Sequence, residues 1–173
     1  VFDFTLPADR WKYLQDHALE EEYEPACMAL EGVPIGTVGL RFKGSYGTLI
    51  PCVEKNTGAI ICDKLSMKVK FSEVYPDRRF HGLKRLNFHS LIHDPTKLRE
   101  RLGYDLYRSM GVRAPHSSWA VVRVNGESFG VFSMVEQIDG RFTGNRWPSN
   151  GGGNLFKEAW PSTTHASYYQ ERL

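Results

Sequence analysis

The chain has 173 residues, of which 41% are hydrophobic and 24% are charged, a composition typical of an ordinary globular domain that can bury a sizeable core. Lysine and arginine total 22 against 20 aspartate and glutamate, and this balance argues against a protein that binds nucleic acid or an anionic membrane through its net charge. There is no apolar run of about 18 residues, so we expect no membrane span.

The N-terminal part of the chain is predicted to lead from a polar segment into a pair of strands. Residues 1–25 are polar with scattered aromatic residues, and we expect a short helix at about 8–20. Residues 26–30 and 38–42 are predicted to be strands that pair across a turn containing a glycine. We therefore treat residues 1–25 as a lead-in and the rest of the chain as the domain.

Residues 64–71 alternate cleanly between apolar and polar side chains, which predicts a strand with one face on a core. The opposite face carries Lys64, Lys68 and Lys70. Lysines in such a row protect an edge strand from aggregation or face an anion such as phosphate. The pattern leaves both interpretations open.

Two of the three cysteines, Cys52 and Cys62, flank a short polar segment with a turn sequence at 56–58. A hairpin there brings the two thiols face to face, so we expect a disulfide between them. Such a bridge places the protein in an oxidising compartment. The alternative is two separate buried thiols.

The clearest helix signal covers residues 95–110, with Asp94 as N-cap and Gly111 after the last turn. By helical periodicity Arg99 falls inside the apolar arc and Glu100 at its border. An inward arginine needs a partner, and a structural ion pair is as good an interpretation as a functional one. The arc itself is formed by apolar residues four apart, namely Leu98, Leu102, Leu106 and Met110.

Residues 118–135 are predicted to form a hairpin around the type I′ turn Asn125-Gly126. The polar residues 136–139 follow at once and either bind a ligand at the strand exit or start a helix capped by Asp139. Strands, one helix and a hairpin in this order predict an α+β fold with an antiparallel sheet and a helix packed on one face.

Two short segments carry possible chemistry. The glycines of residues 43–48 allow backbone amides to approach a phosphate, although the segment is not a Walker loop. His89 and His93 have the spacing of a helical zinc pair but lack the glutamate that follows the first histidine in such motifs, so a metal hydrolase is a third-ranked hypothesis.

Taken in order, eight segments resemble the spore-coat protein H (CotH) kinase family, an atypical, protein-kinase-like group. The resemblance runs from about residue 26 to 160, and residues 94–102 are its most specific part. We therefore interpret residues 26–173 as the N-terminal part of a CotH-like kinase domain. The other matching segments are 38–45, 64–71, 80–88, 111–115, 124–126, 135–139 and 154–158.

The resemblance implies a fold like the N-terminal lobe of a kinase with its hinge. It also implies ATP, Mg²⁺ or another divalent metal, and transfer of the γ-phosphate to Ser or Thr of a secreted or coat protein. The expected location is extracellular, at the cell surface or in a spore coat. The family's catalytic and metal-binding aspartates are expected beyond Leu173, so no residue is assigned as catalytic or as a metal ligand. We expect this piece alone to bind nucleotide poorly and to have no activity.

The resemblance also implies which residues cradle the nucleotide. In kinases a strand lysine contacts the phosphates and pairs with a helix glutamate. Lys64 is the first choice for that lysine and Lys68 the second, with Glu100 as the helix partner and Arg99 as an alternative inward charge. The remaining expected contacts are the glycine-containing loop, Lys43, Gly44 and Ser45, and the hinge, Glu136 to Asp139. The competing hypothesis is a non-catalytic binding or coat-assembly module.

Overall fold

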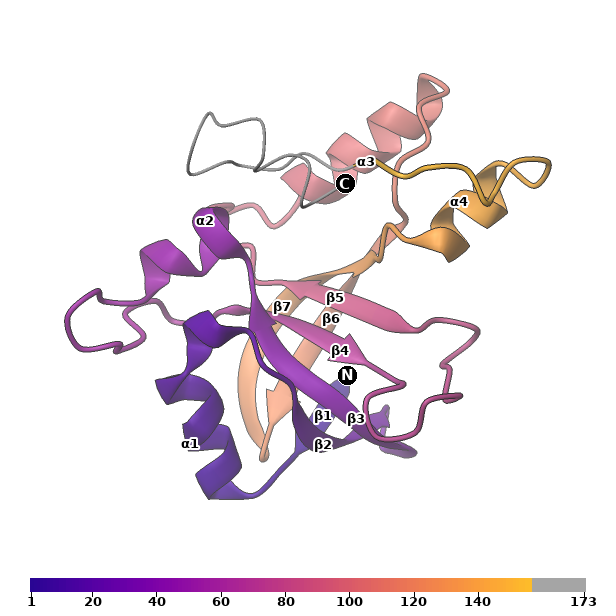
Figure 1. The fold of residues 1–173 in the computed structure, drawn as a ribbon. Helices are drawn as coiled ribbons and strands as arrows, with labels where there is room; N and C mark the ends of the chain where they lie inside the picture. The colour runs from indigo at the N-terminus through magenta and orange to yellow at the C-terminus, as the bar shows by residue number, and fades with distance from the viewer. Residues whose placement is uncertain (157–173) are drawn as a thin grey trace, which may run out of the picture. The chain divides into compact units, whose positions relative to one another are not determined.

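The computed structural model of the protein describes residues 1–156 (Figure 1). The chain divides into two compact units, residues 1–137 and 138–173, which are described separately. The seven strands formed by the described residues lie in the first unit: β1 (Phe2–Thr5), β2 (Glu24–Leu30), β3 (Val33–Lys43), β4 (Ser66–Lys70), β5 (Arg85–His89), β6 (Ser117–Val124) and β7 (Glu127–Glu136).

The helices of the first unit are short and lie between strands. They are α1 (Ala8–Asp16), α2 (Ser45–Thr48), α3 (Arg99–Ser109) and the 3₁₀ turns η1 (Ala18–Glu20) and η2 (Ile50–Cys52). In the described part of the second unit, residues 138–156, the helix is α4 (Gly140–Arg146). None of the helices within residues 1–156 has the length and hydrophobicity that crossing a membrane requires.

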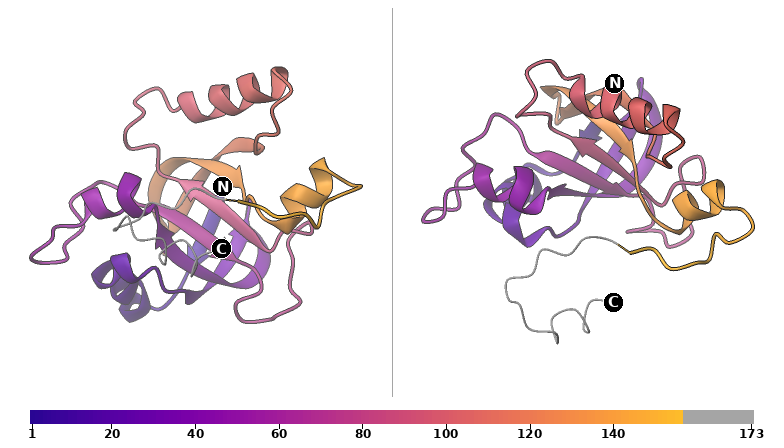
Figure 2. Two further views of the ribbon diagram at one scale, coloured as in Figure 1. Left: turned by 45° about the horizontal axis from the view of Figure 1, so that its top comes forward. Right: turned by 90° about the horizontal axis from the view of Figure 1, so that it is seen from above.

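The seven strands form a closed barrel in the order β1-β2-β3-β4-β5-β7-β6 (Figures 1 and 2). Neighbouring strands are antiparallel except β1 and β6, which run parallel and close the barrel with Phe2 opposite Val122. β1 comes from the segment treated as a lead-in, and it hydrogen-bonds to β2 on its other side. Closure removes the free edges that an open sheet exposes.

Alternation along the strands fills the barrel interior with apolar side chains. Phe88 meets Phe2 and Phe4 edge-on, with ring centroids 5.0 and 6.0 Å apart. Each such buried side chain contributes roughly 1.5–3 kcal/mol to folding. Other fully buried side chains in this core are Met28, Val38, Leu40, Met67, Val69, Val122 and Phe132.

The prediction of an α+β fold with a helix packed on an antiparallel sheet, like the N-terminal lobe of a kinase, was wrong. The structure is a closed seven-stranded barrel with few helices. The helix stripe expected to cover the sheet faces solvent, with exposed fractions of 41–70% from Leu98 to Met110. The side of α3 turned toward the barrel is polar and carries the half-buried Glu100 and Tyr104. The error arose because the apolar side of an amphipathic helix was assumed to be the buried one.

Several local predictions were confirmed. The hairpin β6–β7 turns at Asn125 and Gly126, which have φ of 52° and 85°, as a type I′ turn requires. β2 and β3 pair across Glu31 and Gly32, again both at positive φ.

The predicted disulfide is also present. Cys52 and Cys62 are bridged, with Cα atoms 5.1 Å apart, and the bridge closes a ten-residue separation in the chain. Cys27 is a free cysteine, and it is exposed on β2.

Candidate functional site

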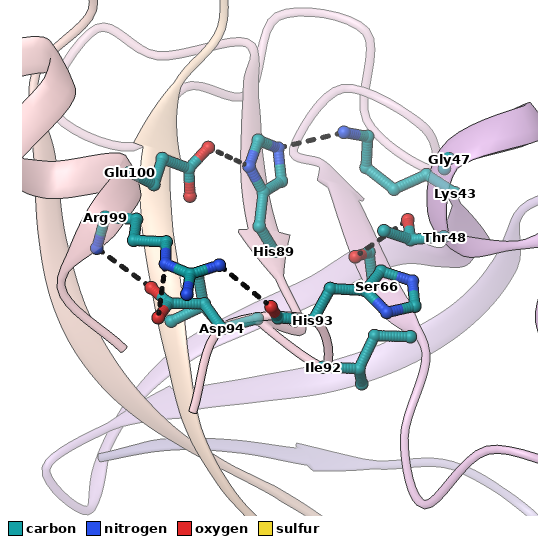
Figure 3. A pocket seen from close by; sticks show the side chains of 12 residues that line it. Lys43, Gly47, Thr48, Ser66, His89, Ile92, His93, Asp94, Arg99 and Glu100 are labelled. Carbon is teal, nitrogen blue, oxygen red and sulfur yellow. Dashed lines mark hydrogen bonds and ion pairs between the residues drawn. The ribbon is translucent and has the colours of Figure 1, made fainter. Parts of the chain in front are cut away.

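A pocket of about 390 Å³ lies where β3 and β5 end and where β4 and α3 begin (Figure 3). Segments far apart in the sequence meet here. The lining residues are Lys43, Gly44, Gly47, Thr48, Ser66, His89, Leu91, Ile92, His93, Asp94, Arg99 and Glu100.

Strand alternation places the polar side chains of this pocket on the outside of the barrel. Phe42, Met67 and Phe88 belong to the buried core, so their neighbours in each strand point the other way. Lys43 is opposite Ser66 in the β3–β4 ladder, and His89 is opposite Ser133 in the β5–β7 ladder. A polar row therefore crosses the outer face of the barrel beneath α3.

Lys43, His89 and Glu100 form a continuous hydrogen-bonded chain across the pocket (Figure 3). The Lys43 Nζ lies 3.0 Å from Nε2 of His89, and Nδ1 of His89 lies 2.6 Å from Oε1 of Glu100. The Tyr104 hydroxyl donates to the same Glu100 oxygen at 3.1 Å. The imidazole thus stands between an ammonium and a carboxylate.

The pocket shifts the pKa values of Lys43 and Glu100, the two ends of this row of hydrogen bonds. Burial lowers the pKa of the Lys43 ammonium below its ordinary value, although the charge of Glu100 opposes the shift. For the Glu100 carboxyl, burial acts in the direction of a higher pKa. Hydrogen bonds from His89, Ser133 and Tyr104, together with the charge of His89, outweigh this effect, so that the pKa falls below its ordinary value. Glu100 is therefore a carboxylate at neutral pH.

The wall opposite α3 is built by the segment from Gly44 to Thr48. Gly44 has φ of +131°, a conformation that L side chains rarely adopt, and a Cβ there would lie 2.1 Å from the Thr48 Oγ1. The Thr48 and Ser66 hydroxyl oxygens are 3.4 Å apart, which ties this wall to the start of β4. The disulfide between Cys52 and Cys62 joins the same two regions of the chain.

The lower wall is ordered by Asp94 (Figure 3). Its carboxylate accepts hydrogen bonds from the Thr96 hydroxyl at 2.6 Å, the Thr96 N–H at 3.0 Å and the Arg99 N–H at 2.8 Å. The Thr96 hydroxyl is the main cause of a lowered pKa for Asp94, with the two N–H groups and the Arg99 charge adding to it. α3 begins at Arg99 with Leu98 as its N-cap residue, so the predicted start at residue 95 with Asp94 as N-cap was wrong, although the Asp94 carboxylate accepts the Arg99 N–H.

The structure brings four of the predicted site residues together in this pocket: Lys43, Gly44, Arg99 and Glu100. Arg99 was expected to point inward, but its side chain is 71% exposed and contacts Asp94 at 3.7 Å from the surface side. Ser45 starts α2 at positive φ beside the pocket and is not among the lining residues.

The two lysines expected to contact phosphates lie elsewhere on the barrel. The Lys64 ammonium donates to the carbonyl of Val131 and lies 4.4 Å from the centroid of the Phe132 ring. Burial, with the nearby Lys97 charge adding to it, lowers the pKa of Lys64 to about 8. Lys68 lies within β4, opposite Arg41 on one side and Asn87 on the other.

The two expected hinge residues have separate structural contacts. Glu136 ends β7, where one carboxylate oxygen accepts the His116 N–H at 3.2 Å. Asp139 belongs to the second unit and caps α4, accepting the N–H groups of Arg141 at 3.0 Å and Phe142 at 3.4 Å. Of the two interpretations of residues 136–139, the start of a helix capped by Asp139 is therefore the one that the structure shows for Asp139. The resembling segment 154–158 extends past the described residues.

Sequence reasoning missed the part that His89, Ser66 and Thr48 play in this pocket. The available signal was alternation in residues 85–89, where Leu86 and Phe88 mark the inner face and so leave His89 outside. His89 and His93 both line the pocket, but residues 89–93 do not form the helix that a zinc pair of this spacing needs. Among residues 1–156, no three His, Cys, Asp or Glu side chains are grouped to hold a metal ion.

The side chains that line the pocket suit a bound anion better than a bound metal cation. Both oxygens of Asp94 accept N–H or hydroxyl groups, and Oε1 of Glu100 accepts from His89 and Tyr104. Lys43 and Arg99 supply positive charge at the same place. We therefore assign no ligand of the divalent metal implied by the resemblance to the described residues.

Comparison with known families gives a match between residues 40–170 and the family described as CotH kinase protein. The chain belongs to the CotH kinase protein family. The match covers every element that builds the pocket, from the end of β3 to α3.

Three curated relatives agree with this assignment. Inner spore coat protein H of Bacillus subtilis is 26% identical over 77 residues, which are 44% of this chain and 21% of that protein. Invasins CotH2 and CotH3 of Rhizopus delemar are 40% identical over 45 residues and 38% over 55, or 26% and 30% of this chain. These matches cover only 8% and 9% of the invasins, so the CotH-family chain corresponds to a small part of each relative's length.

Proposed function

We propose that this CotH-family chain binds the phosphate groups of ATP in the pocket between β3, β5 and α3, as the nucleotide-binding part of a protein Ser/Thr kinase. The observation that carries the proposal is the Lys43 ammonium, which is held over the pocket by His89 beside the Gly44–Thr48 segment. Ammonium and guanidinium groups form strong charge-assisted hydrogen bonds with phosphate oxygens.

The surroundings of Lys43 support this proposal. Gly44 has no side chain, so the backbone of the segment can approach an anion closely. Arg99 adds a second cation from the start of α3, and the hydroxyl of Thr48 also lines the pocket. The acceptor protein for the γ-phosphate is proposed to be a coat or surface protein, since the named relatives are a spore coat protein and two invasins.

Calorimetric titration with ATP and with AMP tests the proposal. Replacing Lys43 by alanine should weaken ATP binding about tenfold or more, equal to the loss of roughly 1.4 kcal/mol from one charged contact. AMP binding should change less, because AMP lacks the β- and γ-phosphates. Lys84→Ala is the matched control, since Lys84 is exposed and does not line the pocket.

Equal ATP affinity in Lys43→Ala and Lys84→Ala would contradict the proposal. A loss of ATP binding in Lys64→Ala but not in Lys43→Ala would move the site to the lysine that the family resemblance favoured. Binding of neither nucleotide by the unaltered protein would favour the non-catalytic coat-assembly function.

A further inference from the structure

His89 is placed to control the lysine of the proposed phosphate pocket, because it is the group that Lys43 contacts within the pocket (Figure 3). We propose that His89 is a pH-dependent positioning residue, which holds the Lys43 ammonium when neutral and releases it toward a bound polyphosphate when protonated. The inference rests on the proposed function and adds a regulation of the same site.

The partners of His89 fix its tautomer when it is neutral. Glu100 is a carboxylate, which can only accept, so the proton of the neutral ring lies on Nδ1 and is donated to Oε1 across 2.6 Å. Nε2 is then the acceptor, and the Lys43 ammonium donates to it across 3.0 Å. In this state the Lys43 ammonium has a good hydrogen-bond partner and stays bonded to the His89 ring.

Protonation of His89 breaks this arrangement on one side only. The protonated ring carries N–H groups on both nitrogens, so Nε2 can no longer accept from Lys43. The bond to Glu100 becomes a charge-assisted pair and keeps the ring in place. Lys43 loses its acceptor and faces a second cation, which favours turning the ammonium toward an anion in the pocket.

The charged groups around His89 come from several helices, strands and loops and include both acidic and basic side chains. Glu100 supplies a carboxylate on one side, and Lys43 and Arg99 supply cations that line the same pocket. Ser133 on β7 faces His89 with an uncharged hydroxyl. Other titratable or charged groups in and beside these elements include Lys68 on β4, His93 and Asp94 in the loop after β5, and Tyr104 on α3.

A polyphosphate bound in the pocket adds negative charge close to His89. If protonated His89 favours polyphosphate binding, then bound polyphosphate must favour protonation of His89 by the same factor. A displacement of the His89 titration midpoint by about one pH unit corresponds to about a tenfold gain in affinity for the protonated form. The coupling is therefore measurable from either side.

Inorganic tripolyphosphate is the probe, titrated calorimetrically at pH 6 and pH 8. His89→Gln is the key variant, because glutamine does not titrate but can still donate and accept hydrogen bonds. Changes in the charge of tripolyphosphate itself affect both proteins equally and cancel in the comparison. The unaltered protein should gain about tenfold more affinity between pH 8 and pH 6 than His89→Gln does.

A second measurement needs no ligand. The titration midpoint of His89, followed by NMR of the imidazole, should rise in Lys43→Met, because the neutral ring loses the donor that stabilises it. Lys84→Met is the control and should leave the midpoint unchanged.

A failure of the proposed role of His89 can be told apart from a failure of the proposed phosphate pocket. If tripolyphosphate binds but the pH effect is the same in the unaltered protein and His89→Gln, the role of His89 is overturned and the phosphate pocket stands. An unchanged His89 midpoint in Lys43→Met would also overturn it. If neither protein binds tripolyphosphate at pH 6, the proposed function falls, and this inference falls with it.

Discussion

His89 on β5 and Glu100 on α3 are joined by a hydrogen bond of 2.6 Å, which links the barrel to the polar side of the helix. Tyr104 reinforces the link from the next turn of α3. Just before α3 begins, the Lys97 carbonyl accepts a hydrogen bond from Nε1 of Trp119 on β6 at 2.9 Å. Polar contacts such as these attach the helix to the barrel, while its apolar stripe is exposed.

Glu100→Gln should lower the free energy of unfolding by about 1–3 kcal/mol at pH 7, since it weakens charged hydrogen bonds in a half-buried position. Urea denaturation measures the effect. Glu127→Gln, at the exposed start of β7, is the control and should be within about 0.5 kcal/mol of the unaltered protein.

The effect of Glu100→Gln should also depend on pH. The pKa of Glu100 is lower in the folded protein than its ordinary value of 4.5, so the stabilisation by the carboxylate is fully present above that value. It is lost as the pH falls from 4.5 through the folded-state pKa. The difference between the two proteins should therefore shrink in acid, and a constant difference down to pH 3 would contradict the assignment.

Leu106→Ala and Leu40→Ala form a matched pair that tests which apolar side chains form the core. Leu106 on α3 is 60% exposed, so its truncation should change the free energy of unfolding by no more than about 0.5 kcal/mol. Leu40 on β3 is 1% exposed, and its truncation should lower that free energy by about 2–5 kcal/mol. Equal losses would mean that the α3 stripe is buried in the protein in solution.

Replacing both Cys52 and Cys62 by alanine should lower the free energy of unfolding by about 2–3 kcal/mol, the loss expected for a short disulfide loop. The same replacement should weaken ATP binding, because the bridge joins the Thr48 wall of the pocket to the segment leading into Ser66. Cys27→Ala is the control, since that thiol is free and exposed. Unchanged stability without the bridge would show that hydrogen bonds alone order this wall.

Lys64→Met should remove a rise in stability at alkaline pH. The pKa of Lys64 is about 8 in the folded protein against 10.5 ordinarily, so between these values the unfolded chain binds more protons. The free energy of unfolding of the unaltered protein should thus gain a contribution as the pH rises from 8 to 10.5. Denaturation at several pH values should show this gain relative to Lys64→Met, and parallel curves would contradict it.

Local structure was predictable where backbone preference or a covalent bond decides it. Asn125 and Gly126 favour positive φ, so their turn fixed the register of β6 and β7. Cys52 and Cys62 lie on either side of a turn sequence, and the bridge followed from that spacing. The strand periodicity of residues 64–71 likewise located β4, although its observed ends are Ser66 and Lys70.

The closure of the barrel and the centre of the pocket were not predictable in the same way. Nothing local in Phe2 indicates that it pairs in parallel with β6, since that partner is distant in the sequence. Glu100 was singled out, but its contact is His89, and a residue's partner across the fold depends on how β5 and α3 pack. The stripe on α3 was identified correctly and assigned to the wrong environment, because periodicity reveals an apolar face and not what covers it.

The parallel pairing of β1 with β6 has a consequence for synthesis on the ribosome. β1 leaves the exit tunnel before β6 and can pair early with β2, but its other partner is made only when residues 117–124 emerge. Until then one side of β1 has unpaired backbone groups, and its phenylalanines lack part of the barrel wall. The barrel therefore cannot close until β6 has been made. A pairing between segments so far apart in the sequence slows folding, and the edge of β1 is exposed to aggregation in the meantime.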